Sequence, residues 1–301
     1  MSTGKCRKHP FEVRNRRSER IDDSEARVIQ FIADSQDKVT FANLSKHFCT
    51  GERGDRRELK RLLTRLVNKG RLCYQSHLGN SIIELSYEKP VTVSERVVLK
   101  PPKVFYTPEN DQQIVTLQRG ASFGGGEHPS TRLAIQLIDL MLGQLPWREN
   151  KTQINAVDIG TGCGVLAVTA ARLGVGHIYA VDLDPCAVFE AKANVRLNGV
   201  EAQVDVSGHS FAEIPSIFDL VLANLRTPTL LDLRKLIAKK TAQRSALVFS
   251  GMKADECEGL RAAYAKSGFF LSEKRQEKGW CSLYLIRSVS SHRPPESLSG
   301  Y

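Results

Sequence analysis

The sequence contains no Cys-x-x-Cys pair, and no uncharged run approaches the roughly 18 apolar residues that a membrane span needs. Its seven cysteines are odd in number and scattered, which argues against a disulfide framework or a zinc ribbon and predicts reduced thiols in a cytoplasm. The first 20 residues are basic, but no apolar stretch follows them to make a signal peptide. We therefore expect a cytoplasmic protein with no membrane segment and no metal site.

What the sequence does contain is ordinary globular material with an uneven charge. Hydrophobic residues make up 41% and charged residues 25%, which excludes wholesale disorder. Of the net charge of +10, +8 falls in residues 1–100, where 21 Lys and Arg face 13 Asp and Glu. A basic segment joined to a nearly neutral one indicates contact with a polyanion such as nucleic acid, although a solvated basic surface gives the same count.

The apolar pattern changes along the chain. Apolar residues at helical spacing begin at Asp22, at Thr40 and at Asp55. Asp55 is expected to cap the third helix, which is rich in Arg and Lys, and two short strands follow it. Three helices and a hairpin predict a winged-helix-like domain, with a small helical adaptor as the alternative. The predicted parts are a basic flexible tail, the basic winged-helix-like domain, a proline-containing linker, a main domain and a polar tail: residues 1–20, 21–87, 88–119, 120–287 and 288–301.

Strands and helices alternate through residues 120–287, which predicts an α/β fold with a doubly wound, mostly parallel sheet. The last two strands, near Phe269–Lys274 and Cys281–Arg287, have no helix between them, so an antiparallel strand inserted at one edge of the sheet is expected. Ligands of such sheets bind beyond the carboxyl ends of the strands, and the motifs there are the candidate site.

A glycine-rich turn joins the first apolar strand of this domain to a helix. Gly160, Gly162 and Gly164 allow a tight turn and a close approach to a ligand. Asp182 ends the next strand, 18 residues after Gly164, where a carboxylate can accept hydrogen bonds from ribose hydroxyls. Asp158 lies just before the glycines, badly placed for a phosphate and well placed for an ammonium group. The pattern therefore favours S-adenosylmethionine (SAM) over a dinucleotide.

Two further motifs supply the remaining candidate residues. His128 and Thr131 follow three adjacent glycines, with Ser130 or Thr131 expected to cap a helix; a structural loop histidine and a simple cap are the alternatives. Asn224 ends a buried strand, where its amide can orient a nucleophile, although strands often end at Asn. We predict Asn224 and His128 as catalytic residues.

Five segments, in order, resemble the catalytic domain of the methyltransferases of ribosomal protein L-eleven, the PrmA family: FGGGEHPST, VDIGTGCGVLAV, AVDLDPCAVFEAKANVRLNGV, DLVLANLRTPTLLDL and GWCSLYLIR. The resemblance covers about residues 118–287 and implies a Rossmann-like class I methyltransferase with a seven-stranded sheet. It further implies that Thr131, Gly160, Asp182 and Asn224 bind SAM and that amines of a protein, possibly ribosomal, receive the methyl group.

The basic domain at residues 21–87 differs from the α/β module that this family carries in front of its catalytic domain. Two alternatives to protein methylation therefore stay open. One is an RNA or other nucleic-acid methyltransferase. The other is a nucleic-acid-binding protein that senses SAM without catalysis.

Overall fold

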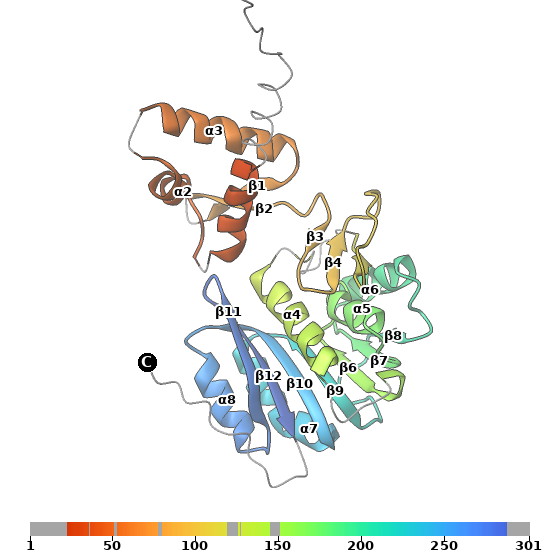
Figure 1. Ribbon diagram of the computed structural model, residues 1–301. Coiled ribbons are helices and arrows are strands. Elements are labelled where there is room, and N and C mark those ends of the chain that lie inside the picture. The colour runs from red at the N-terminus through yellow and green to blue at the C-terminus, as the bar shows by residue number, and fades with distance from the viewer. Residues whose placement is uncertain are drawn as a thin grey trace, which may run out of the picture. The chain divides into compact units, whose positions relative to one another are not determined.

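The computed structural model describes residues 23–287, apart from residues 36, 51–52, 78–79, 119–125, 127 and 145–150 (Figure 1). The chain divides into two compact units, Met1–Ser86 and Tyr87–Tyr301. Both predicted tails lie outside the described residues. Within the described part of the chain, no helix is long and apolar enough to cross a membrane.

The first unit has three helices and a hairpin, in the order predicted for a winged-helix-like domain. Residues 23–34 form the first helix. The other elements are α2 (Phe41–Phe48), α3 (Arg53–Asn68), and the antiparallel strands β1 (Leu72–His77) and β2 (Asn80–Leu85). Apolar side chains from every helix and both strands form its core, among them Val28, Ile32, Leu44, Leu63, Leu66, Leu72 and Ile83.

Local hydrogen bonds fix the ends of these helices. Thr40 caps α2 in a capping box with Asn43. The predicted cap of α3 is wrong, because the helix already begins at Arg53 and Asp55 lies in its first turn. The Asp55 carboxylate instead accepts hydrogen bonds from the backbone and hydroxyl of Thr50, both at 2.8 Å. The side chain thus holds the chain that enters the helix.

The segment predicted as a linker, residues 88–119, instead contains a three-stranded sheet of the second unit. Strand β4 (Val97–Lys100) pairs with β3 (Val91–Thr92) in antiparallel and with β5 (Gln113–Thr116) in parallel fashion. Asn198 donates to the Thr116 carbonyl and accepts from its amide. The segment is therefore fixed to the domain that follows it.

The main sheet of the second unit has seven strands in the order β11-β12-β10-β9-β6-β7-β8. All run parallel except β12, which lies antiparallel between β10 and β11 and confirms the predicted inserted strand. The strands are β6 (Asn155–Ile159), β7 (His177–Val181), β8 (Val204–Ser207), β9 (Phe218–Asn224), β10 (Thr241–Lys253), β11 (Phe270–Glu277) and β12 (Trp280–Arg287).

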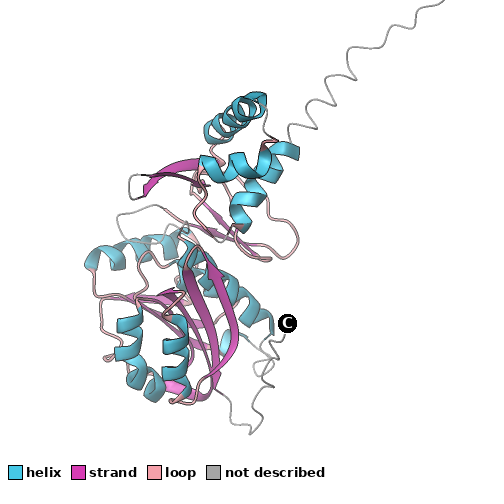
Figure 2. Ribbon diagram, turned by 90° about the vertical axis from the view of Figure 1, so that its left-hand side faces the viewer, coloured by secondary structure: helices cyan, strands magenta, loops and turns pink. Residues whose placement is uncertain are grey.

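Helices cover both faces of this sheet (Figures 1 and 2). On one face α4, α5 and α6 pack in sequence, and on the other α7 packs against α8. They are α4 (Pro129–Gln144), α5 (Val165–Arg172), α6 (Pro185–Leu197), α7 (Thr227–Lys240) and α8 (Cys257–Ala265), with the short 3-10 helix η1 (Lys151–Gln153) before β6. The predicted α/β, doubly wound fold is confirmed.

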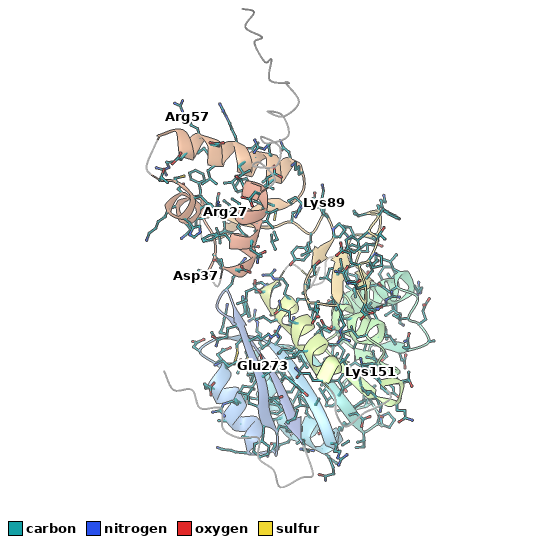
Figure 3. The ribbon with its side chains drawn as sticks, in the orientation of Figure 1. Arg27, Asp37, Arg57, Lys89, Lys151 and Glu273 are labelled. Atoms are coloured by element: carbon teal, nitrogen blue, oxygen red, sulfur yellow. A yellow bond between two sulfur atoms is a disulfide. The ribbon has the colours of Figure 1, made fainter. Side chains whose placement is uncertain are left out.

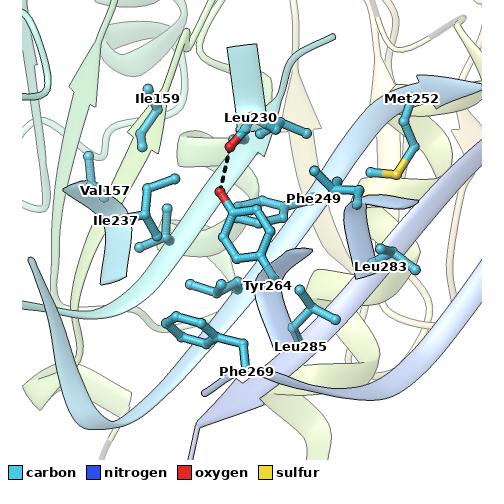
Figure 4. Packing of buried hydrophobic residues seen from close by; sticks show 14 of the residues in the cluster. Val157, Ile159, Leu230, Ile237, Phe249, Met252, Tyr264, Phe269, Leu283 and Leu285 are labelled. Atoms are coloured by element: carbon cyan, nitrogen blue, oxygen red, sulfur yellow. Dashed lines mark hydrogen bonds between the residues drawn. The ribbon is translucent and has the colours of Figure 1, made fainter. Parts of the chain in front are cut away.

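The apolar core beneath α7 and α8 contains the hydroxyl group of a buried tyrosine, Tyr264. Tyr264 is fully buried among Phe249, Phe269 and Leu285, and its hydroxyl donates to the Leu230 carbonyl at 2.8 Å (Figure 4). Burial raises the pKa of this phenol above its usual range. The bond satisfies the only polar atom of the ring, so a large aromatic side chain can fill the space between α7 and α8 without a desolvation penalty.

The prediction that the thiols are reduced is wrong for one pair. Cys257, the first residue of α8, and Cys281 on β12 form a disulfide, with Cα atoms 6.3 Å apart. The two are 24 residues apart and show no spacing motif, so only the packing of α8 against β12 brings them together. The bond ties this helix to the inserted strand.

Candidate active site

The candidate site lies at the carboxyl ends of β6, β7 and β9, where the glycine turn follows β6. Gly160, Gly162 and Gly164 have φ angles of 70°, 56° and 83°. These values lie in the left-handed region, where a residue with a side chain would be strained. The Gly160 and Thr161 amides donate to the Val181 carbonyl at 2.8 and 3.0 Å, which fixes the turn against β7. A Cβ at Gly160 would lie 2.6 Å from Leu225, so the protein itself as well as a ligand requires the absence of a side chain there.

Asp182 stands beside this turn, directly after β7. Its carboxylate accepts the Gly162 amide at 2.9 Å and the Asp184 amide at 3.0 Å. The side chain is half-buried, and a carboxylate offers about four acceptor positions, so two remain for hydroxyl groups of a ligand. Asp182 thus holds the glycine turn in shape and presents acceptors at its edge.

Asp158 lies under the turn and is 1% exposed. One carboxylate oxygen accepts from the Thr161 hydroxyl at 2.7 Å and the Ala167 amide at 3.2 Å, while Oδ1 has no hydrogen-bond partner among the described residues. Burial raises the pKa of this carboxyl to about 7, against the lowering effect of those two bonds, and the charge of Asp182 raises it further. A cation placed near Oδ1 would favour the ionised form.

Asn224 and Thr131 meet across the sheet edge. The Asn224 amide Nδ2 lies 3.4 Å from Thr131 Oγ1, a long hydrogen bond between the end of β9 and the first turn of α4. Thr131 is fully buried and Asn224 half-buried. The Asn224 carbonyl oxygen is not used in this contact, so it remains as an acceptor for a bound amine.

The predicted cap of α4 is wrong, because the helix begins at Pro129 and His128 precedes it. Proline suits this first position since its missing N–H would have no partner in the helix. The Ser130 amide donates to His128 Nδ1 at 3.3 Å, and the Ser130 hydroxyl shares a 2.8 Å hydrogen bond with the same nitrogen. His128, rather than Ser130 or Thr131, therefore caps the helix.

The His128 ring also contacts an aromatic side chain. It packs edge to face on Trp280, with ring centroids 4.5 Å apart, and the Lys253 ammonium lies 3.7 Å from the centre of the Trp280 ring. The hydrogen bonds to Ser130 and the contact with Trp280 give His128 a structural role. Its assignment as a catalytic residue stays a prediction.

Sequence reasoning missed a set of buried serines that connects α4 to the sheet. Ser282 on β12 donates to the Ser250 hydroxyl on β10, which donates to the Ser130 carbonyl at 2.7 Å. Ser250 also pairs in register with Asn224. No sequence signal marks these residues, because they are far apart in the chain and serine is common. They fix the start of α4 relative to Asn224.

Two more residues at this edge were missed. Gly251 has a φ of 86°, and a Cβ there would lie 2.8 Å from Asn224 Oδ1 and 2.7 Å from the Leu225 carbonyl. Glu256 accepts the Lys253 amide at 2.9 Å and the Thr227 hydroxyl at 2.7 Å, and these bonds lower the pKa of its carboxyl. Gly251 makes room for the Asn224 side chain. Glu256 fixes the start of α7, the helix that follows Asn224 in the chain.

The donor set fits SAM better than a dinucleotide. Asp158 places a buried carboxyl directly beneath the turn, where a dinucleotide would bring a pyrophosphate that a carboxylate would repel. The unpartnered Asp158 Oδ1 suits the ammonium of an amino acid, reached directly or through water, and Asp182 suits ribose hydroxyls. No group of three His, Cys, Asp or Glu side chains able to hold a metal occurs among the described residues.

Comparison with known proteins gives the family. The family model described as Ribosomal protein L11 methyltransferase (PrmA) matches residues 83–288, more than half of the chain. Curated ribosomal protein L11 methyltransferases are 33% identical over 201 residues in Geotalea uraniireducens and 35% over 204 residues in Geotalea daltonii. These matches cover 65% and 66% of this chain but only 64% and 65% of the relatives' own length.

A solved structure agrees with the sequence relatives. The crystal structure of a ribosomal protein L11 methylase from Lactobacillus delbrueckii subsp. bulgaricus is 26% identical, with a TM-score of 0.58. It covers 66% of this chain and 99% of the solved one. The range of the family model, residues 83–288, contains the glycine turn, Asn224 and the inserted strand. The chain therefore belongs to the ribosomal protein L11 methyltransferase (PrmA) family.

Proposed function

We propose that this protein is a SAM-dependent N-methyltransferase that methylates amines of a protein substrate, with a ribosomal protein as the preferred candidate. The observation that carries this proposal is the pairing of two groups at one sheet edge. Asp158 and Asp182 flank the glycine turn, and Asn224 lies against Thr131 at the neighbouring strand end. The relatives' names supply the acceptor class. The cytoplasm is the proposed location.

SAM, when bound, would supply a sulfonium methyl group, to whose carbon an acceptor amine bonds in line while the carbon–sulfur bond breaks and the thioether leaves. The residues of this chain contribute position rather than a strong base, because the Asn224 amide does not take up protons. Asn224 can accept a hydrogen bond from the amine at Oδ1, while Thr131 and Gly251 fix the direction of its side chain. Holding the amine aligned is a large part of such catalysis.

The amine must arrive without its proton. For a lysine with a free pKa of about 10.4, deprotonation at pH 7 costs about 4–5 kcal/mol. Burial beside a sulfonium lowers that cost, since a cation disfavours a second positive charge nearby. Entry into the site would therefore favour release of the amine's proton to solvent.

The test is to incubate the protein with radiolabelled SAM and a cell lysate depleted of small molecules, with and without nuclease. The proposal expects label on protein, insensitive to nuclease and lost in Asn224→Ala. Label on nucleic acid would favour the nucleic-acid methyltransferase. Binding of SAM without transfer to any acceptor, in lysates and in purified ribosomal subunits, would favour the sensor.

We further propose that the first unit contacts nucleic acid, because most of the net positive charge falls in residues 1–100. Such contact would bring the second unit to substrates that lie on or beside a polyanion.

A further inference from the structure

The basic residues of the first unit are not equivalent, and the structure separates those that are used inside the unit from those that are not. Two cations, Arg65 on α3 and Lys69 directly after the helix, are held by the first helix. Arg65 Nε lies 3.5 Å and Lys69 Nζ 2.7 Å from the carboxylate of Glu25, which is 7% exposed. One buried carboxylate thus offsets part of these two charges within the domain.

Two others lie on the side of α3 that faces α2. The Arg56 guanidinium and the Lys60 ammonium lie 5.8 and 5.4 Å from the ring centre of Phe41, the first residue of α2. Cation–π contacts at this distance hold both side chains in place and leave their charges uncompensated. They form one rim of the helix.

Between these two sides runs an exposed stripe. Arg57, Arg61, Thr64 and Asn68 are spaced by four, three and four residues, which places them on one face of α3, and all four are exposed. The structure gives neither arginine an ion pair with the described residues. The nearest acidic residue of the helix, Glu58, lies off this face, on the side of Arg65. Figure 3 shows Arg57 projecting from the outer side of α3.

The buried face of α3, opposite the stripe, fixes the orientation of the helix. Leu59, Leu62, Leu63 and Leu66 are buried in the core, so the helix cannot rotate about its axis without losing that burial. The hairpin is attached to the start of α2 as well, because the Ile83 amide donates to the Val39 carbonyl at 2.8 Å. The arrangement is that of a helix pair with an adjoining hairpin, in which the second helix of the pair is presented to a partner.

We infer that the stripe on α3 binds the major groove of double-stranded DNA. Paired arginines match phosphates or guanine edges, and the Asn68 amide can bond to base edges. The Thr64 hydroxyl donates to the Lys60 carbonyl at 2.9 Å, so its oxygen can accept a hydrogen bond and its methyl group can contact a thymine methyl. Arg56 and Lys60 on the rim match the phosphates of one groove wall. The B-form groove, about 12 Å wide, admits a helix, whereas the deep, narrow groove of duplex RNA does not.

This inference rests on the nucleic-acid contact proposed above and does not depend on methyl transfer. The experiment is a fluorescence-anisotropy titration of the full-length protein against labelled DNA duplex, RNA duplex and single-stranded DNA at several salt concentrations. Three to four phosphate contacts predict a log–log slope of affinity against salt of about −3 for the DNA duplex. RNA duplex and single strand should bind more weakly.

The variant Arg57→Ala/Arg61→Ala should flatten that slope by up to about 2 and weaken duplex binding about tenfold or more. Alanine favours helix, so the fold is retained, which circular dichroism checks. The matched control is Lys235→Ala/Lys239→Ala, an exposed lysine pair at the same spacing on α7, which should leave duplex binding unchanged. Arg57→Lys/Arg61→Lys should keep the slope but lose base selectivity, because lysine cannot bond bidentately.

Three results would overturn the inference. They are the absence of DNA binding at low salt, an equal or greater affinity for duplex RNA or single strands, and an equal loss of binding in the α3 and α7 variants. SAM affinity, measured by calorimetry on the same samples, separates this outcome from a failure of the proposed function. Loss of DNA binding with SAM binding intact concerns the first unit alone.

Discussion

In the second unit the candidate site consists of buried or half-buried side chains that are already bonded to the protein, whereas in the first unit the candidate surface consists of exposed arginines. Asp158 accepts one hydrogen bond from the glycine turn and one from α5. Asp182 accepts one from the same turn and one from the Asp184 amide. Arg57 and Arg61 have no such constraint. A change in the second unit should therefore act on one ligand and one step, while a change in the first should act additively and depend on salt.

The largest expected effect tests whether the two units are independent. Leu66 is 0% exposed in the core of the first unit, so Leu66→Ala should destabilise that unit by about 3–4 kcal/mol. Calorimetry should show one unfolding transition lowered and the other unchanged, with SAM affinity intact. Leu260→Ala, equally buried on α8, is the matched change and should lower the other transition. If both transitions moved together in either variant, the comparison between separate units would fail.

Next in size is the effect of Asn224→Ala on turnover. Loss of an orienting amide should lower kcat about a hundredfold, because small misplacements of an acceptor are costly. Unfolding free energy should change by about 1 kcal/mol or less, since the lost 3.4 Å contact is long. Steady-state kinetics and a denaturant titration measure the two. Full turnover with the best acceptor would reduce Asn224 to a residue that merely ends β9.

A smaller effect is expected on cofactor affinity from Asp182→Ala. Loss of its acceptors should weaken SAM binding about tenfold to a hundredfold in calorimetry. The matched control is Asp184→Ala, two residues on, whose carboxylate caps α6 through the Cys186 amide and should matter only for stability. Equal SAM affinities in the two variants would remove Asp182 from the site.

The smallest effect is a pH dependence caused by Asp158. Its folded-state pKa of about 7 lies above the unfolded value, so its contribution to stability is fully present below about pH 3.9 and is lost as the pH rises through 7. A ligand cation prefers the ionised carboxyl, so SAM affinity should increase about tenfold from pH 5.5 to 7. Asp158→Asn should make the affinity nearly flat over this range. A wild-type profile as flat as that of the variant would contradict the placement of a cation there.

The sequence predicted most where structure depends on local pattern. Strand–helix alternation predicted the doubly wound, mostly parallel sheet, and the spacing of Gly160, Gly162, Gly164 and Asp182 predicted the turn with its neighbouring carboxylate. The three-stranded sheet of residues 91–116 escaped because β3 has two residues and β4 and β5 have four each, too short for a periodic signal among prolines.

Other features depended on distant partners. The bonds from Ser282 through Ser250 to Ser130 and the disulfide of Cys257 with Cys281 join segments that no spacing rule connects. Two helices begin earlier than predicted, at Arg53 and at Pro129. Asp55 and Ser130 are good caps by residue type, yet the backbone is already helical before them. Side-chain type alone does not fix where a helix begins.

The crowding around Gly251 has a consequence for mutational tolerance. The position contributes no chemical group, yet any side chain there would meet Asn224 Oδ1 within 2.8 Å. In a saturation library selected for activity, position 251 should therefore be depleted of variants as strongly as position 224. A survey of that kind would report a glycine as though it took part in the reaction, when its contribution is the volume it leaves to its neighbour.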